Sequence, residues 1–410
     1  MPTLLKKKTS NSPGIISFTH NEVLWGVSAK YPKIRNLLIE KSEKKEWIFG
    51  VHIQGDCNFL EKWPQEQWQS FYLWPNKNEK YLKNINPSKI LPYTCVNFLK
   101  KFDLENTKKT WDLCIISRPS EIKRIKETLL IVRDLMNLNK DLTCLFIVPD
   151  PRIINEGVNT YKINKIDKTF FNNPLKFFTA KELKNLSFIS TSQNSFGKFP
   201  IQDHLISTLL SQSKFLFLYS HKEGVPRVIG ESLMSGTPCI VSKNLKSGLN
   251  NILNETNTLF IDDNLEIATK QILYAILNYK NYNFDKKIIN SIFSYNENID
   301  NFKNDLSKLF IENDLEDPKN WIFNDLPQRL ACHGMKNNYQ LMNNDKLFLE
   351  WFNKIDNFEN VTDLFFDDIS YFSDHESINL RNYKYILRKK ISSIYFIYIF
   401  RKFLLNIFKN

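Results

Sequence analysis

The sequence predicts an α/β fold in which helices cover a parallel sheet. Short, continuous apolar runs recur between residues 112 and 261, as expected of strands that are buried on both faces. Segments with helical spacing separate several of these runs, and such alternation favours parallel pairing. With 410 residues, of which 42% are hydrophobic, the chain is long enough for two or more domains. The predicted strands are 112–117, 142–148, 186–190, 215–219, 238–241 and 258–261.

Helices are predicted at 121–136, 204–211 and 265–277. The first shows the clearest pattern, because apolar side chains recur there at the spacing of one helix face. These side chains are Ile122, Ile125, Leu129, Val132 and Met136. Ser120, which directly precedes this segment, is a suitable N-cap.

The chain divides into three predicted parts. Residues 1–106 hold short apolar runs at 14–18, 47–54, 70–74 and 89–93, between charged stretches, and indicate a short α/β domain. Residues 107–300 contain the regular strand and helix pattern. Residues 301–410 differ in composition: acidic and aromatic residues dominate up to His375, and the segment from residue 381 to 410 is basic and aromatic.

Charge and cysteine content narrow the class of protein. The net charge of +12 fits nucleic acid, anionic lipid or phosphorylated substrates. None of the six cysteines has CxxC spacing, and Cys114, Cys144 and Cys239 lie in apolar runs, where free Cys behaves as a small hydrophobe. We therefore expect a reducing compartment and no structural zinc. The first residues lack the apolar segment of a secretory signal, so a cytoplasmic location is expected.

The segment 216–242 combines an apolar strand, a polar loop, a helix and a second strand. Two carboxylates, Glu223 and Glu231, lie on the loop and the helix, and Pro226 suits the first turn of that helix. Gly224 permits close backbone approach or a positive φ. A helix N-terminus attracts anions, and carboxylates accept hydrogen bonds from sugar hydroxyls. The pattern therefore indicates a nucleotide-sugar site, although an ordinary loop with two solvated glutamates has the same spacing.

Two cations follow the strand at 112–117. Arg118 and Lys123 lie near the tip of that strand, where they can clamp a diphosphate and stabilise its charge as it leaves. Arg124 replaces Lys123 if the register shifts by one residue. The alternative is that both cations are solvated surface charges.

The segment from Ser220 to Ser242 resembles the donor-site signature of retaining glycosyltransferases of the GT-B fold, in the large family 4 group. The matching residues are the Glu-Gly pair at Glu223, the second acid at Glu231 and the Gly-Thr-Pro turn that begins at Gly236. The strand, Arg118 and Lys123 resemble a second part of the same signature. The resemblance implies a GT-B-like α/β fold with two Rossmann-like domains, a parallel sheet in each, and a helical C-terminal extension. It also implies that residues 1–106 form the acceptor side and that residues 107–300 bind the donor.

The resemblance also implies roles for the candidate residues. Glu223 would contact hydroxyls of the donor sugar, and Glu231 would hold the ribose diol. Backbone N–H groups at Gly224 and Val225, next to Pro226, would approach the sugar or the diphosphate. Arg118 and Lys123 would stabilise the departing diphosphate. The reaction would need no metal and no cofactor besides the nucleotide-diphosphate sugar.

Two features depart from the family pattern. Residues 243–249 replace a Gly-rich loop, and the short amino-terminal domain has no Gly-Gly loop. His52 and His20 are candidates for a site on that domain, and a purely structural role is the alternative for each. His221 precedes Glu223 and is a further candidate for the mouth of the site. No group of His, Cys and Asp residues has metal-ligand spacing.

The tail at 381–410 is basic, aromatic and aliphatic. Its unbroken apolar stretch is shorter than the ~20 residues that span a bilayer. A helix of this composition could lie on an anionic membrane surface. It could equally pack back on the domains. Specific nucleic-acid binding is not expected, because no groove-reading or stacking motif accompanies the charge.

The sequence thus predicts a glycosyltransferase that transfers a sugar from a nucleotide-diphosphate donor to a glycan, lipid-linked or polysaccharide acceptor, with retention. A cytoplasmic protein is expected, with attachment to the inner face of the membrane as an option. One alternative is a non-catalytic nucleotide-sugar-binding partner. A second is a protein that binds membranes or nucleic acid and uses the GT-B fold only as a scaffold.

Overall fold

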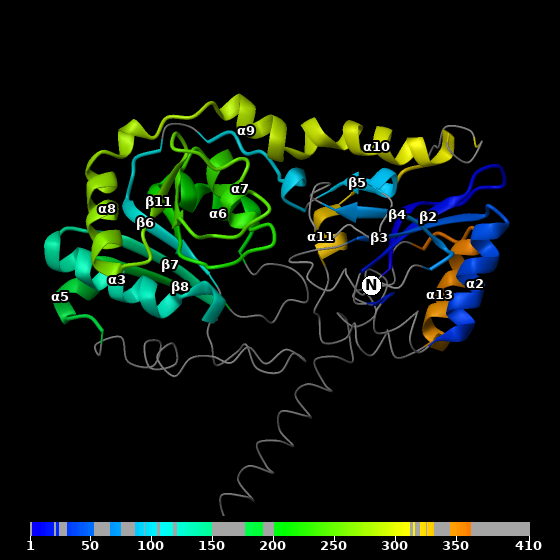
Figure 1. Ribbon diagram of the computed structural model, residues 1–410, viewed down its shortest axis with the longest axis horizontal. Helices are drawn as coiled ribbons and strands as arrows, with labels where there is room; N and C mark the ends of the chain where they lie inside the picture. The colour runs from blue at the N-terminus through cyan, green and yellow to red at the C-terminus, as the bar shows by residue number, and fades with distance from the viewer. Residues whose placement is uncertain are drawn as a thin grey trace, which may run out of the picture. The chain divides into compact units, whose positions relative to one another are not determined.

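We analysed a computed structural model of the chain (Figure 1). The structure describes residues 2–19, 22–23, 31–52, 66–74, 87–93, 95–104, 107–117, 121–149, 177–191, 201–311, 315, 320–324, 326–331 and 345–361. Apart from residues 360–361, these all belong to one compact unit, Met1–Glu359. Arg118, His20, Ser120 and the tail at 381–410 lie outside the described residues.

The predicted fold class is confirmed: the chain is an α/β protein with two separate sheets, which are parallel except at one edge (Figure 1). The first sheet has the order β1-β2-β3-β4-β5, and only the pair β1–β2 is antiparallel. Its strands are β1 (Thr3–Lys6), β2 (Gly14–Thr19), β3 (Trp47–His52), β4 (Gln69–Trp74) and β5 (Ile90–Pro92). The four predicted apolar runs of residues 14–93 are β2 to β5.

Strand β1 was not predicted, because its last residue begins a run of three lysines. Lys6 is nevertheless fully buried. Its ammonium donates hydrogen bonds to the carbonyl oxygens of Pro13, at 2.7 Å, and Lys7, at 3.0 Å, and lies 5.6 Å from the ring centroid of Phe310. Burial lowers the pKa of Lys6 to about 8. The lysine is thus a structural part of the edge strand and no part of a solvated basic patch.

Helices from the C-terminal third of the chain cover both faces of the first sheet. On one face, α10 (Tyr295–Ile311) and α11 (Leu326–Ala331) share a core with strand residues such as Ile15, Ile48 and Phe71. Side chains that alternate with these point to the other face. There, Trp47 packs on Phe352 of α13 (Asp345–Asp356), with ring centroids 5.4 Å apart, and α13 lies beside α2 (Pro32–Glu43). The helices predicted as an extension therefore complete the core of the first sheet.

The second sheet contains six strands, all parallel, in the order β11-β10-β9-β6-β7-β8. Each corresponds to one of the six apolar runs predicted between residues 112 and 261. The strands are β6 (Trp111–Ile116), β7 (Cys144–Pro149), β8 (Leu186–Thr191), β9 (Ser213–Leu218), β10 (Cys239–Ser242) and β11 (Thr258–Ile261). Burial raises the pKa of both Cys114 and Cys239 to about 12, consistent with cysteines that act as small core residues.

Helices cover this second sheet on both faces (Figure 1). One core contains residues of α3 (Ile125–Leu138) and α8 (Leu265–Leu277). The opposite core contains residues of α6 (Asp203–Ser211), α7 (Arg227–Met234) and α9 (Lys286–Phe293). The remaining helical elements are short: α5 (Ala180–Leu183) and the 3₁₀ turns η4 (Pro87–Lys89), η5 (Cys95–Phe98), η6 (Glu121–Lys123) and η8 (Tyr279–Asn281).

The strand order of the second sheet reverses between the neighbouring strands β6 and β9. From β6 the sheet grows through β7 to β8 on one side, whereas β9 pairs with the other side of β6 and is followed by β10 and β11. Loops that leave the carboxyl ends of β6 and β9 therefore depart to opposite faces. Open α/β sheets bind ligands at such a switch point.

In the described part of the chain, one connection runs from β5 to β6 and another from the second sheet to α10, and the two contact each other. Leu99 donates its N–H to the carbonyl of Phe293 and accepts from the N–H of Tyr295, at 2.8 and 2.9 Å. A Cβ atom added to Gly230 of α7 would lie only 2.6 Å from a methyl carbon of Val96. The first connection therefore needs a glycine in α7 in order to pack this closely.

The predicted helices at 204–211 and 265–277 are α6 and α8. Asn264 caps α8, since its side chain accepts hydrogen bonds from the N–H groups of Glu266 and Ile267. The helix predicted at 121–136 instead begins with the 3₁₀ turn η6, and α3 starts only at Ile125. Its N-cap residue is Arg124, which has a φ of 50° and makes no capping hydrogen bond with its side chain.

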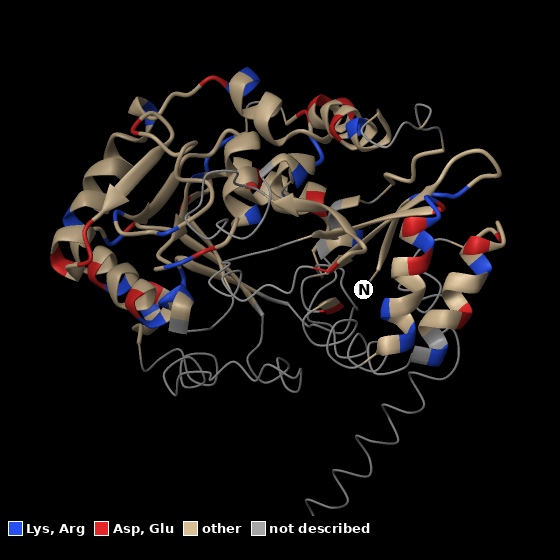
Figure 2. Ribbon diagram, turned by 45° about the vertical axis from the view of Figure 1, so that its right-hand side comes forward, with Lys and Arg blue, Asp and Glu red and all other residues tan. Residues whose placement is uncertain are grey.

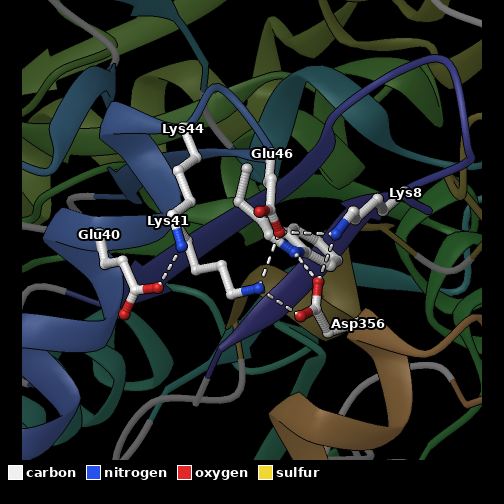
Figure 3. A network of polar contacts seen from close by, with 7 residues as sticks. Lys8, Glu40, Lys41, Lys44, Glu46 and Asp356 are labelled. Carbon is white, nitrogen blue, oxygen red and sulfur yellow. Dashed lines mark hydrogen bonds and ion pairs between the residues drawn. The ribbon is translucent and has the colours of Figure 1, made fainter.

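A network of charges attaches α13 to the first sheet (Figure 3). Lys8 and Lys41 each contact both Glu46 and Asp356, with N–O distances of 2.6 to 2.8 Å. The indole N–H of Trp47 also donates to Asp356, at 2.7 Å. Hydrogen bonds from Lys41 and Lys8 lower the pKa of Glu46. Burial alone would raise the pKa of Asp356, but hydrogen bonds from Lys41, Lys8 and Trp47 hold it below its ordinary value.

We predict that Asp356→Asn destabilises the protein by about 2 kcal/mol at neutral pH, because three buried or half-buried donors lose a charged acceptor. The pKa values of the network carboxylates are lowered by folding. Their contribution is therefore complete above the ordinary carboxyl pKa of about 4 and is lost as the pH falls through the lower folded value. Calorimetric unfolding of wild type and Asp356→Asn should show a difference in Tm at neutral pH that shrinks in acid.

The matched control for this experiment is Asp300→Asn, which breaks an exposed pair with Lys303 on α10 and should leave the Tm unchanged. A difference between wild type and Asp356→Asn that is the same at neutral and acidic pH would contradict the assignment.

Candidate functional site

The candidate residues gather where the chain reverses direction in the second sheet. The loop after β9 is joined to the turn after β6, because the N–H of His221 donates to the carbonyl of Ile122 at 3.2 Å. The same loop pairs with residues 246–248: the N–H of Glu223 donates to the carbonyl of Lys246, at 2.9 Å. Two segments about a hundred residues apart in sequence therefore form one continuous surface at the carboxyl ends of β6 and β9.

Lys123 and Glu223 form an ion pair across this junction. Their side chains are 23% and 10% exposed, so the pair is half-buried and still accessible. The structure therefore places two of the candidate catalytic residues in direct contact. Of the candidate cations that the structure describes, Lys123 is the one that contacts Glu223.

Arg124, the alternative to Lys123, points elsewhere. Its guanidinium lies 3.9 Å from the ring centroid of Tyr219 and pairs with Asp263 at 2.7 Å. Asp263 also accepts hydrogen bonds from Ser242, at 3.0 Å, and Asn244, at 2.6 Å. Burial opposes ionisation of Asp263, but these hydrogen bonds and the one from Arg124 lower its pKa to about 2. Asp263 was not among the candidate residues of the sequence analysis, because its partners lie at or after the ends of two other strands, β6 and β10.

Helix α7 presents its N-terminus to the same region. Pro226 is the N-cap and directly precedes the first helical residue, so it lies one position before the predicted first turn. Gly224 does not use the positive φ that the sequence allows; among described glycines only Gly236 does, with a φ of 75°. The close approach occurs at Gly248, where an added Cβ would lie 3.0 Å from the Gly224 carbonyl oxygen and 3.1 Å from a methyl carbon of Val225.

Glu231 lies in the second turn of α7 and is 17% exposed. Burial raises its pKa, and the neighbouring charge of Arg227 partly offsets this effect. Arg227 donates to Glu231 at 2.6 Å and also pairs with Asp203, at the start of α6, at 3.1 Å. Arg227 and Asp203 were not predicted. The spacing of four residues between Arg227 and Glu231 on one helix is nevertheless typical of an ion pair.

The histidine candidates lie in different surroundings. His52 ends β3 in the first sheet, is 1% exposed, and its Nδ1 lies 2.9 Å from the hydroxyl of Ser17. This placement fits the structural alternative. His221 lies in the loop before Glu223, and His20 is outside the described residues.

Among the described residues, no group of three His, Cys, Asp or Glu side chains is arranged to hold a metal ion. Across the same part of the chain, no helix is both long and apolar enough to cross a membrane. Lys, Arg, Asp and Glu are interspersed on the described helices, so one sign of charge does not dominate them (Figure 2).

No protein-family model and no curated protein sequence matches the chain. Similar solved structures include the pneumococcal O-GlcNAc transferase GtfA in complex with UDP and GlcNAc, at 13% identity and a TM-score of 0.46, over 68% of this chain and 55% of that one. TarM of S. aureus has 14% identity and a TM-score of 0.41, over 74% and 49%. Anabaena HepE in complex with UDP has 12% identity and a TM-score of 0.44, over 67% and 77%.

This chain thus spans about half the length of GtfA and TarM.

We predict that Gly236→Ala destabilises the protein by about 1–2 kcal/mol, because an L residue is disfavoured at positive φ. Gly236→Asn is the matched control: it adds the same Cβ but tolerates this conformation better. The nearest atoms to that Cβ are the end of the flexible Lys286 side chain, which can move aside. Chemical denaturation should therefore rank wild type above Asn above Ala. Equal losses for Ala and Asn would show that crowding decides the effect.

Proposed function

We propose that this protein is a glycosyltransferase that uses a nucleotide-diphosphate sugar as its donor. The observation that carries the proposal is the Lys123–Glu223 ion pair at the switch point between β6 and β9. A cation and a carboxylate from two different βα segments meet there, beside the N-terminus of α7. This combination suits a ligand that has both a diphosphate and sugar hydroxyls.

In the proposed reaction, negative charge develops on the departing diphosphate. Lys123 would stabilise this charge together with Arg118, and the N–H groups at the start of α7 would add to the positive potential. Glu223 would accept hydrogen bonds from hydroxyls of the sugar. The catalytic contribution would come from charge placement and from holding donor and acceptor together. Retention, metal independence and a relation to family 4 form part of this proposal.

We further propose that Glu231 binds the ribose diol. Glu231 is half-buried and forms an ion pair with Arg227, and this placement supports a role in binding. The charge of Arg227 stabilises the ionised form of the carboxylate, which burial disfavours. Gly224, Val225 and Pro226 would bring the loop backbone close to the donor. The acceptor would be a glycan or a lipid-linked sugar. The tail at 381–410 would attach this cytoplasmic protein to an anionic membrane surface.

A non-catalytic nucleotide-sugar-binding partner is the second candidate function. The burial of His52 against Ser17 favours it, because this candidate for the acceptor side is withdrawn from solvent. Both candidates require the same donor site, so binding and turnover must be measured separately.

The proposed function predicts that the protein binds one nucleoside diphosphate. Calorimetric titration with UDP, GDP and ADP should identify it, and CMP serves as a nucleoside monophosphate for comparison. Glu231→Ala and Arg118→Ala should each weaken binding about tenfold or more, the effect of losing one charge-assisted contact of ~1.4 kcal/mol. Slow hydrolysis of the matching nucleotide sugar, detected as released diphosphate, would then distinguish the enzyme from the non-catalytic partner.

Matched controls for these substitutions are Glu266→Ala on α8 and Arg133→Ala on α3. Each removes an exposed charge that lies on a helix covering the same sheet and that pairs with a neighbour on that helix, so both should leave the affinity unchanged. If the folded protein binds none of the three nucleoside diphosphates, the glycosyltransferase proposal is wrong.

A further inference from the structure

Arg124 has an unusual backbone conformation for its place in the fold. Other non-glycine residues with positive φ include Lys45 and Phe358, which follow the ends of α2 and α13, where this conformation is common. Arg124 lies between the 3₁₀ turn η6 and the first residue of α3, and an N-cap residue in this position normally has extended backbone. A left-handed conformation is unfavourable for an L residue and persists only where its surroundings enforce it.

The surroundings of Arg124 do enforce this conformation. The side chain is buried between the ring of Tyr219, 3.9 Å away, and the carboxylate of Asp263, 2.7 Å away. Ser242 and Asn244 hold Asp263 in turn, and the hydroxyl of Tyr219 donates to the carbonyl of Asp262 at 3.1 Å. One guanidinium therefore connects the residues that follow β9 and β11 with the end of β10.

The backbone of Arg124 is held as well. Its carbonyl accepts hydrogen bonds from the N–H of Thr128, at 2.9 Å, and from the hydroxyl of the same residue, at 3.0 Å. Two residues earlier, the carbonyl of Ile122 accepts from His221. The turn that carries Lys123 is thus fixed on both sides, and the side chain of Arg124 is its anchor on the strand ends.

We propose that Arg124 is a positioning residue that holds Lys123 in contact with Glu223. Lys123 is its immediate neighbour, so rotation of the Arg124 backbone toward an ordinary φ would turn the peptide that carries Lys123. In this role Arg124 acts through Lys123. The role of Arg124 in catalysis rests on the proposed function, whereas its effect on the Lys123–Glu223 contact does not.

Arg124→Gly tests the proposal, because glycine can adopt the same φ but has no side chain to hold it there. The native protein is treated with a low dose of acetic anhydride, and acetylation of Lys123 is measured by peptide mass spectrometry relative to exposed Lys270. Release of a half-buried ion pair should raise the relative reactivity of Lys123 about threefold or more. Arg133→Ala, on the same helix, is the control and should leave it unchanged.

Asp263→Asn serves as a second variant in case Arg124→Gly does not fold, since it keeps the shape of the carboxylate and removes its charge. It should change the reactivity of Lys123 in the same direction. Unchanged reactivity of Lys123 in a folded Arg124→Gly or Asp263→Asn variant would overturn the positioning role.

Acetylation of Lys123 and titration with nucleotides test the positioning role of Arg124 and the proposed function separately. Raised Lys123 reactivity together with weaker UDP binding, or weaker binding of whichever diphosphate the wild type prefers, supports both. If Lys123 is more reactive in the variant but the wild-type protein binds no nucleotide, the positioning role is supported and the proposed function is refuted. Normal reactivity in a protein that binds a diphosphate refutes the positioning role and leaves the proposed function intact.

Discussion

The reversal of strand order between β6 and β9 is the constraint on which the rest of the site depends. Parallel strands place all their carboxyl ends at one edge of the sheet. The chain leaves β6 toward one face and β9 toward the other, and the two connections begin side by side at this switch point. Lys123 and Glu223 lie at the start of these two connections and form an ion pair there. The proximity of residues about a hundred positions apart is thus a consequence of topology.

The first sheet depends on a different feature, which is that helices from far along the chain cover parts of both its faces. Helices α10 and α11 cover one face, and α13 covers part of the other. The chain therefore returns to the first sheet after completing the second. Side chains such as Phe302 and Phe352 contribute to the core of strands that precede them by more than two hundred residues. This return also brings Asp356 to Lys8 and Lys41.

Elements with a strong local signal could be predicted from the sequence. The six strands of the second sheet are continuous apolar runs, and α6 and α8 have clear helical spacing. Strand β1 was missed because burial of Lys6 depends on acceptors supplied by Pro13 and Lys7 and on the ring of Phe310. The packing role of α10 and α13 was missed for a similar reason: composition shows an aromatic segment but not the sheet that it covers.

The candidate site, like the fold, could be predicted where the local sequence carries a signal and not where tertiary contacts decide the structure. The spacing of Glu223, Glu231 and Lys123 placed them near a strand end, and the structure brings Lys123 and Glu223 together. The conformation of Arg124 was not predictable, because left-handed backbone at a helix start contradicts local preference and depends on tertiary contacts of the Arg124 side chain with Tyr219 and Asp263. The close approach at Gly248 likewise depends on the position of Gly224, which is set by tertiary pairing.

The central claim is that a nucleoside diphosphate binds at the carboxyl ends of β6 and β9. A crystal structure of the protein grown with saturating UDP, or with whichever nucleoside diphosphate it binds, tests this most directly. We predict electron density for the diphosphate within hydrogen-bonding distance of the Lys123 ammonium, beside the N-terminus of α7. Density for the nucleotide at any other place, with the Lys123–Glu223 pair undisturbed, would contradict the account.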